Sequence, residues 1–159
     1  ASLINGGKLI TPTLKLNNNK NIKPQRVISE KTSEKLRNIL RKVVTHEKGT
    51  ASLANIYGYN VSGKTGTSQY YNDKNKNINT FISFFVVSKK TYTLLVMLDD
   101  PQIAKDLVYN YRGLRIKGTR NEAGWNAVYS SGKIIEKIGP ILAINNKEIP
   151  THHVVKKTN

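Results

Sequence analysis

The sequence contains no cysteine, so it forms no disulfide and offers no thiolate to a metal ion. It has only three histidines, His46, His152 and His153, and none has a carboxylate partner at the spacing of a zinc site. No apolar run reaches the roughly 18 residues that a membrane span requires. We therefore expect no metal, no cofactor and no membrane-crossing segment in this chain.

Acidic residues are also scarce, with 10 Asp and Glu against 26 Lys and Arg, which gives a formal net charge of +16. Such a balance often marks a protein that binds nucleic acid. Here the basic residues are scattered, and they are accompanied by many asparagines, as in 17–19 and 72–79. We attribute the charge to a general enrichment in lysine and asparagine and expect no nucleic-acid partner. A basic, non-catalytic binding module stays an alternative.

The chain of 159 residues is long enough for one domain with its own core. It has no initiator methionine and no signal sequence, and residues 1–5 resemble the last turn of a helix that stops at Gly6-Gly7. We therefore expect a piece of a longer protein. Residues 1–149 form its single domain, and residues 150–159 are predicted to be a flexible tail.

An amphipathic helix is predicted after Ser29, because Ser29 is a favourable N-cap and Glu30 suits the first turn. Its apolar residues repeat with helical spacing, and the helix ends before Gly49. A second helix is predicted from Ala127 to the apolar residues around 142, with a break or kink at Gly139-Pro140. The intervening residues 103–124 read as a mixed, basic connection.

Two dense apolar runs, 78–87 and 91–98, have strand length and are rich in β-branched and aromatic residues. Only residues 88–90 separate them, so they are predicted to form an antiparallel hairpin. Because both runs are apolar on both faces, we expect helices to cover the sheet from two sides. The predicted fold class is α/β of the α+β type, an antiparallel sheet sandwiched by helices.

The stretch 58–69 allows two kinds of chemistry. Residues 58–65 match Gly-x-x-x-x-Gly-Lys-Ser/Thr, the phosphate-binding P-loop, and the strand ending at Asp99 resembles one that holds Mg²⁺. A P-loop, however, follows a buried strand and opens a helix, whereas Thr65 to Gln69 are poor helix formers. A P-loop nucleotide-binding enzyme is therefore the less favoured alternative.

Residues 64–67, Lys-Thr-Gly-Thr, also match the Lys-Thr-Gly signature of penicillin-recognising serine enzymes. This interpretation predicts a strand through the motif, paired with 78–87. Lys64 supplies a positive charge, the hydroxyls of Thr65 and Thr67 can bind a substrate carboxylate, and Gly66 leaves room for substrate beside the strand. A backbone N–H just after the glycine can serve as an oxyanion donor.

The order of several segments resembles the C-terminal part of class B penicillin-binding proteins, and above all their septal peptidoglycan D,D-transpeptidases. The segments that carry the resemblance are 24–29, the amphipathic helix, 62–69, the hairpin, 99–102 and 123–127. The resemblance covers residues 3–144. It implies a partial transpeptidase fold of the serine β-lactamase type, in a parent protein that is anchored in the inner membrane and acts in the periplasm.

The resemblance also implies what the parent protein does and which residues take part. The parent would cross-link peptidoglycan stem peptides during septal wall synthesis, together with other division proteins, and β-lactams would inhibit it. Lys64 and Thr67 would be catalytic: Lys64 lies beside the serine of the family's Ser-x-Asn motif, and Thr67 N–H donates to the oxyanion. Thr65, Gly66 and Thr67 would bind the substrate or antibiotic, with the two hydroxyls on its carboxylate.

The family's nucleophile belongs to a Ser-x-x-Lys motif upstream of Lys-Thr-Gly, and no such motif precedes Lys64 here. The one instance, Ser130 to Lys133, lies downstream, and we treat it as a coincidence. The isolated chain is therefore expected to be inactive. Because strand 91–98 would pair in the family with strands from earlier in the protein, we expect an exposed sheet edge that self-associates or pairs with the missing N-terminal part.

Overall fold

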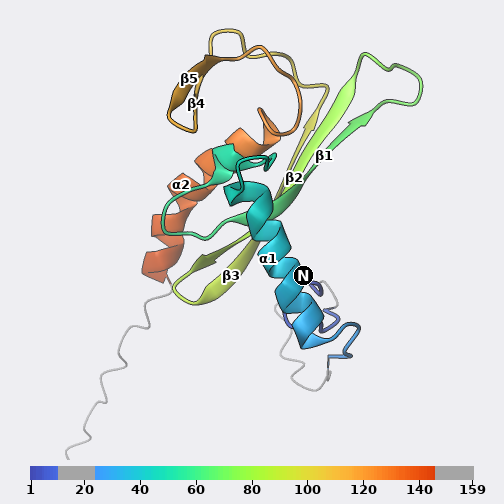
Figure 1. The fold of residues 1–159 in the computed structure, drawn as a ribbon, viewed down its shortest axis with the longest axis vertical. Helices are drawn as coiled ribbons and strands as arrows, with labels where there is room; N and C mark the ends of the chain where they lie inside the picture. Colours follow the sequence, from blue (N-terminus) through green and yellow to red (C-terminus); the bar gives the residue numbers. More distant parts are fainter. Residues whose placement is uncertain (11–23, 146–159) are drawn as a thin grey trace, which may run out of the picture.

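The computed structural model describes residues 1–10 and 24–145. Figure 1 shows a three-stranded antiparallel sheet, two long helices and a separate two-stranded hairpin. The mixed class and the antiparallel sheet agree with the fold class predicted from the sequence. The predicted tail from Pro150 lies outside the described residues.

The first helix, α1, spans Glu30–Thr45 and begins where the sequence predicts. The Ser29 side chain accepts a hydrogen bond from Thr32 N at 3.0 Å, which satisfies one of the free N–H groups of the first turn. The side chain of Arg41, which lies in α1, donates to the carbonyl of Val61 and to Asn55 Oδ1. These bonds tie α1 to the chain that enters the motif.

The main sheet has the order β1-β2-β3, formed by Ser62–Gln69, Asn77–Val87 and Lys90–Asp99. The predicted hairpin is β2-β3, with Val87 paired with Lys90 and both Ser88 and Lys89 at positive φ. Strand β1 pairs with β2, so that Thr65 lies opposite Phe81 and Thr67 opposite Asn79. The motif therefore lies on an edge strand.

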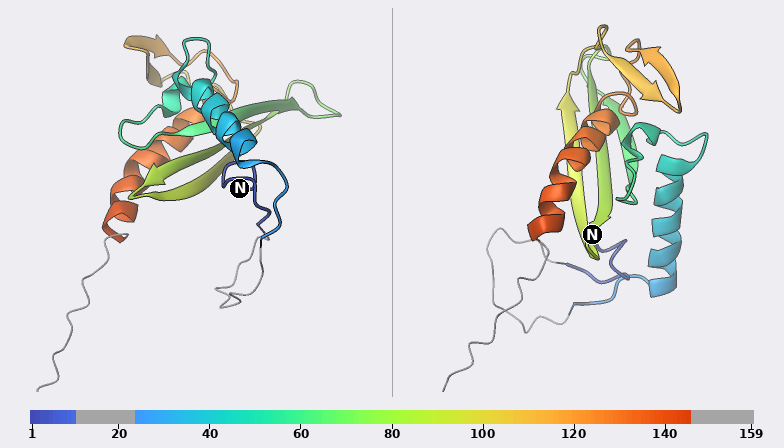
Figure 2. Two further views of the ribbon diagram at one scale, coloured as in Figure 1. Left: turned by 60° about the horizontal axis from the view of Figure 1, so that its bottom comes forward. Right: turned by 90° about the vertical axis from the view of Figure 1, so that its left-hand side faces the viewer.

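The second helix, α2, spans Ala127–Asn145 and lies along β2 and β3, whereas α1 lies beside β1 (Figure 2). A short 3-10 helix, η1, at Ser52–Ala54 contacts both. The core lies between these elements and one face of the sheet. Its buried members are Val44, Ala51, Ala54, Val61, Phe81, Phe85, Val87, Ala123, Ala127, Val128 and Ile135.

The other face of the sheet is partly open. Ile82, Leu95 and Met97 have exposed fractions of 50, 58 and 63% and share this face, because β-strand side chains alternate. On β3 the side chains toward α2 are half-buried and those on the opposite face are exposed. The sequence predicts helices on both sides of the sheet, but the cover on this second face is incomplete and leaves these apolar side chains exposed.

Two features differ from the sequence prediction. Residues 103–124 contain a second hairpin, formed by β4 at Val108–Tyr111 and β5 at Leu114–Lys117. Of the predicted break or kink at Gly139-Pro140, the break is wrong, because α2 continues through Pro140 to Asn145. Pro140 removes only one N–H from the helical ladder, and it lies close enough to the C-terminal end for the rest of the ladder to hold.

Within residues 1–10 and 24–145, no helix combines the length and the apolar composition needed to cross a membrane.

Candidate functional site

The Lys-Thr-Gly-Thr stretch lies in the middle of β1, and its backbone is paired with β2 throughout. No helix begins after Lys64, since the strand runs on to Gln69. A P-loop needs that helix, whose N-terminus receives the phosphates. The stretch therefore has the strand geometry of the penicillin-recognising signature, and the P-loop geometry does not form.

Alternation along β1 divides the motif between two faces. Thr65 and Thr67 lie on the face that carries Phe81 and Asn79 of β2, and Lys64 lies on the opposite face with Ile82. The Lys64 side chain is exposed, and its Nζ donates to the carbonyl of Thr65 at 2.8 Å. Of the predicted site residues, the structure thus brings the two threonines together and turns the lysine away from them.

The two threonines lie in a cleft of about 370 Å³. The turn after α1, the end of β4, the segment before α2 and β1 itself form its walls. The lining residues are Glu47, Lys48, Gly49, Thr50, Thr65, Thr67, Tyr111, Arg120, Glu122, Gly124 and Trp125. Hydroxyl, guanidinium and carboxylate groups thus converge beside an aromatic wall, which is the mixture expected of a binding site for a polar ligand.

The turn after α1 contacts two other walls of the cleft. Thr50 Oγ1 lies 2.9 Å from Thr65 Oγ1, so the turn after α1 is bonded to β1. Gly124 belongs to the opposite wall, and a Cβ built there would lie 2.6 Å from the Thr50 carbonyl oxygen. The glycine permits this close approach because any side chain would push the two loops apart.

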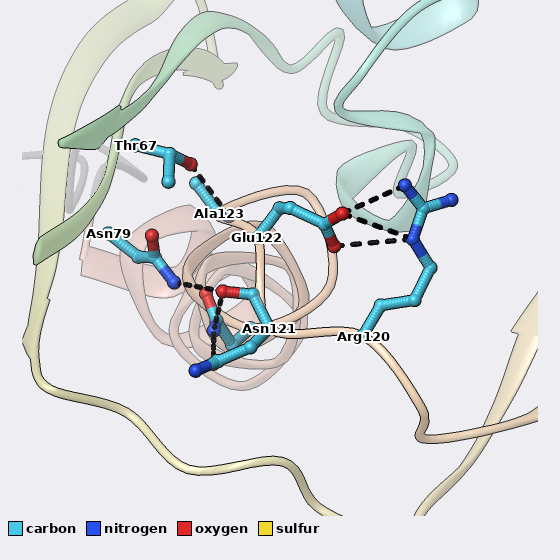
Figure 3. Close-up of polar contacts among 7 residues, drawn as sticks. Thr67, Asn79, Arg120, Asn121, Glu122 and Ala123 are labelled. Atoms are coloured by element: carbon cyan, nitrogen blue, oxygen red, sulfur yellow. Dashed lines mark hydrogen bonds and ion pairs between the residues drawn. The ribbon is translucent and has the colours of Figure 1, made fainter. Parts of the chain in front are cut away.

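Thr67 is bonded to the segment that leads into α2. Its Oγ1 accepts a hydrogen bond from Ala123 N at 3.1 Å, as Figure 3 shows. No other partner of this oxygen is found among the described residues. After this bond the hydroxyl still has its proton and a second lone pair for a ligand in the cleft.

Arg120 and Glu122 form the charged wall of the cleft (Figure 3). The Arg120 Nη2 to Glu122 Oε1 distance is 2.9 Å, and Arg120 Nε lies 3.2 Å from Oε2. The hydrogen bond from Arg120 lowers the pKa of Glu122 and burial opposes this shift, while the same bond raises the pKa of Arg120. At neutral pH the cleft therefore carries one fixed ion pair.

An aromatic group supports this charged wall. The Tyr111 and Trp125 rings are stacked with their centroids 5.0 Å apart, and the Arg120 guanidinium lies 5.4 Å from the Trp125 centroid. Tyr109 contacts Trp125 and Tyr129 edge-on, at 5.4 and 5.1 Å. These contacts fasten the β4-β5 hairpin to the start of α2 and make Tyr111 a rigid part of the cleft.

Gly66 does not line the cleft. A Cβ at this position would lie 2.6 Å from Thr80 Oγ1, which donates to the Gly66 carbonyl oxygen at 3.3 Å. The close approach that the structure contains at Gly66 is therefore to β2. Substrate contact at this glycine stays a prediction from the resemblance.

The Ser-x-x-Lys sequence at Ser130 lies within α2. Its lysine, Lys133, donates to Glu136 Oε2 at 2.8 Å, and this bond raises the lysine pKa. A lysine that acts as a base needs a lowered pKa, so this one is poorly suited to activate a serine. In the part of the chain that the structure describes, no group of three or more His, Asp or Glu side chains could hold a metal ion.

The family of this chain follows from comparison of its sequence with known proteins. The sequence model of the penicillin-binding protein transpeptidase domain matches residues 1–118. The chain belongs to the penicillin-binding protein transpeptidase family. Its similarity is to the class B members.

Curated relatives are 29% and 34% identical to the chain over the segments that align with it. The chain is 29% identical to a probable peptidoglycan D,D-transpeptidase FtsI of Caulobacter vibrioides over 163 residues, which cover 92% of the chain and 25% of the relative. It is 34% identical to stage V sporulation protein D of Bacillus subtilis over 117 residues, or 64% of the chain and 18% of the relative. The chain thus spans about a quarter or less of these proteins.

Solved structures support the same fold. The transpeptidase domain of Burkholderia pseudomallei penicillin-binding protein 3 superposes with a TM-score of 0.62 at 22% identity, over 88% of this chain and 39% of that one. A peptidoglycan glycosyltransferase of Burkholderia ambifaria gives a TM-score of 0.57 at 21% identity, over 86% and 37%. The sheet, α1 and α2 therefore form part of a transpeptidase fold.

Proposed function

We propose that this chain is the carboxylate-binding part of a peptidoglycan D,D-transpeptidase that cross-links stem peptides in the septal cell wall. The observation that carries this proposal is that Thr65 and Thr67, on one face of the Lys-Thr-Gly strand, both line the same cleft. Hydroxyl donors beside a guanidinium suit the carboxylate of a donor peptide or of a β-lactam. The names of the relatives support the same substrate class.

Lys64 takes a different part in this proposal. It lies on the face of β1 that also carries the exposed Ile82, and its ammonium contacts only the adjacent backbone carbonyl among the described residues. We infer that this ammonium faces the serine of a Ser-x-Asn motif when the whole transpeptidase domain is present. Thr67 N–H then supplies one donor to the oxyanion formed when the nucleophilic serine attacks.

The chain alone is proposed to be inactive, because neither the nucleophilic Ser-x-x-Lys motif nor the Ser-x-Asn motif precedes Lys64. The reaction would need the N-terminal part of the domain. We place the parent protein at the periplasmic face of the inner membrane, where septal transpeptidases meet their substrate and other division proteins.

The open sheet face is proposed to be a contact surface. Ile82, Leu95 and Met97 form an apolar face beside the outer edge of β3, which pairs with no other strand in the part of the chain that the structure describes, and a sheet edge readily pairs with another strand. In the whole protein this surface would receive the N-terminal part of the domain. In the isolated chain it would bind a second copy.

The carboxylate role is tested by the rate at which a reporter penicillin acylates a longer version of the protein that includes the Ser-x-x-Lys motif. Thr67→Val removes one charge-assisted hydrogen bond of about 1.5–3 kcal/mol, so the second-order rate constant should fall roughly 10- to 100-fold. Ser68→Ala is the matched control, because it also removes one hydroxyl but on the opposite face of β1. Equal rates in these two variants would contradict the proposal.

A further inference from the structure

The cleft beside β1 has a balance of charge that the chain as a whole lacks. The sequence contains 26 Lys and Arg against 10 Asp and Glu. Among the described residues that line the cleft, the cations are Lys48 and Arg120 and the anions are Glu47 and Glu122. The turn after α1 and the segment before α2 each contribute one residue of either sign. A site for a simple anion would gain from an excess of cations, so this balance indicates a ligand that carries both charges.

The Arg120–Glu122 pair holds its two charges in a defined orientation. Arg120 donates to the glutamate only through Nε and Nη2, at 2.9 to 3.3 Å, and Figure 3 shows its third nitrogen outside the pair. The guanidinium also lies over the Trp125 ring, with Cζ 5.4 Å from the ring centroid. Because the guanidinium is already paired along one edge and placed over a ring, little further ordering is needed when a ligand binds.

Both partners keep hydrogen-bonding capacity after the pair has formed. Arg120 Nη1 has no hydrogen-bond partner among the described residues, and together with Nη2 it forms a second edge that suits a carboxylate. Glu122 Oε2 accepts one bond, from Arg120 Nε, and keeps a lone pair for an ammonium group. An ammonium beside Glu122 and a carboxylate beside Arg120 would each lie next to a charge of opposite sign.

The stacked rings of Tyr111 and Trp125 supply the apolar part of the same wall. An alkyl chain that leads to the charged group can lie along these rings, and the cleft volume of about 370 Å³ is sufficient for a small ligand. The wall therefore fits an alkyl chain whose last carbon carries both an ammonium and a carboxylate. The side chain of a diamino-dicarboxylic acid in a peptide ends in this way, whereas a lysine side chain ends in an ammonium alone.

We propose that Arg120 and Glu122 form a subsite for a zwitterionic group, in which Glu122 binds the ammonium and Arg120 binds the carboxylate. This inference rests on the proposed function, because the zwitterion is assigned to a diamino-dicarboxylic residue of the stem peptide. The subsite uses side chains other than the two threonines and lies off the Lys-Thr-Gly strand. The cleft therefore favours stem peptides that contain a diamino-dicarboxylic residue over those that contain lysine at that place.

The test uses the full 159-residue chain labelled with nitrogen-15 and three probes that share one acetylated alkyl chain. Nε-acetyllysine carries an ammonium and a carboxylate, Nε-acetyllysine amide carries the ammonium only, and 6-acetamidohexanoate carries the carboxylate only. Trp125 is the one tryptophan of the sequence, so its indole N–H signal reports binding at this wall. We expect the zwitterion to bind roughly fivefold more tightly than either singly charged probe, as the contribution of one half-exposed charge pair allows.

Two variants separate the contributions of the two charges. In Arg120→Gln the zwitterion should bind no more tightly than the cationic probe, and in Glu122→Gln it should bind no more tightly than the anionic probe. A merely structural role would instead weaken all three probes alike. Lys133→Gln is the matched control, because it breaks the other ion pair found among the described residues, Lys133–Glu136, which lies outside the cleft lining. This control should leave all three dissociation constants unchanged.

The inference is overturned if no probe shifts the Trp125 signal, if the unmodified chain binds 6-acetamidohexanoate as tightly as Nε-acetyllysine, or if both variants weaken all three probes alike. The proposed function is judged separately, by penicillin acylation of the longer version. If Thr67→Val slows acylation while the zwitterion is not preferred, the proposed function stands and only the subsite is wrong. If Thr67→Val leaves acylation unchanged, the proposed function fails whichever probe the chain prefers.

Discussion

The two threonines of the motif differ in how their hydroxyls are held. Thr65 shares a hydrogen bond with the hydroxyl of Thr50, and Thr67 accepts one from the backbone of Ala123. Either hydroxyl of the Thr50–Thr65 pair can be the donor in their bond, whereas Thr67 is the acceptor in its bond with Ala123. At the scale of single residues, the two threonines are thus anchored to different walls of the cleft.

The Arg120–Glu122 pair gives a residue-scale prediction about pH. Because the hydrogen bond from Arg120 lowers the Glu122 pKa below the usual value of 4.5, Glu122 should titrate at lower pH in the folded chain. The stability that it contributes is fully present above pH 4.5 and is lost as pH falls through the lower, folded-state pKa. Both side chains are more than half exposed, so this contribution should be below about 1 kcal/mol.

An NMR titration of the Glu122 side-chain carboxyl measures this shift. In Arg120→Gln the midpoint should rise toward the usual value for glutamate, since the variant loses the charged donor. Equal midpoints in the two proteins would show that Arg120 does not hold the carboxylate.

At the scale of elements, local signals predict most of the main fold. The Ser29 cap, the helical spacing of α1 and the short turn between two apolar strands need no information from distant parts of the chain. The β4-β5 hairpin was missed because its strands have four residues each and its turn is Arg112-Gly113. Both turn residues have positive φ, which Asn-Gly would have indicated more strongly than Arg-Gly.

The cleft depends on contacts that sequence spacing does not provide. Tyr111, Arg120 and Glu122 were assigned to a basic connection, yet the hairpin and the aromatic contacts bring them to β1. Lys64 and Thr65 are adjacent in a strand, so their side chains lie on opposite faces of the sheet. This arrangement could have been predicted from the sequence. The sequence also contains an indication of Asn79, because it is a polar residue at a core-facing position of a largely apolar strand.

Helix α2 gives an element-scale prediction. Pro140 lies inside the helix, is exposed, and cannot donate to the carbonyl four residues earlier. Pro140→Ala should therefore raise the free energy of unfolding by about 1–3 kcal/mol, measured by urea denaturation. Lys137→Ala, an exposed change one turn earlier, should have little effect. A decrease in stability on Pro140→Ala would mean that the proline fixes a bend that the packing of α2 requires.

At the scale of the whole molecule, the sheet is covered well on one face and poorly on the other. The covered face carries the core, and the open face carries Ile82, Leu95 and Met97 beside the β3 edge. The chain spans 25% of its Caulobacter relative, so most of such a protein lies outside this sequence. We propose that the open face is the surface that would contact the other parts of such a protein.

Self-association of the isolated chain follows from this surface and is measured by sedimentation velocity at several concentrations. We expect concentration-dependent dimers or larger species, and Leu95→Lys should shift the chain toward monomer by placing a charge on the open face. Ile39→Lys is the matched control, because Ile39 and Leu95 are both 58% exposed but Ile39 lies on α1. A monomeric unmodified chain at all concentrations would contradict the contact surface.

The most direct test of the central claim is intact-protein mass spectrometry after incubation with a reporter penicillin. It compares this chain with the longer version that includes the Ser-x-x-Lys motif. We predict a covalent adduct on the longer version only, because under the proposed function this chain supplies the carboxylate-binding strand and the nucleophile belongs to the upstream motif. A stoichiometric adduct on this chain alone would contradict the account and make Ser130 the nucleophile to examine.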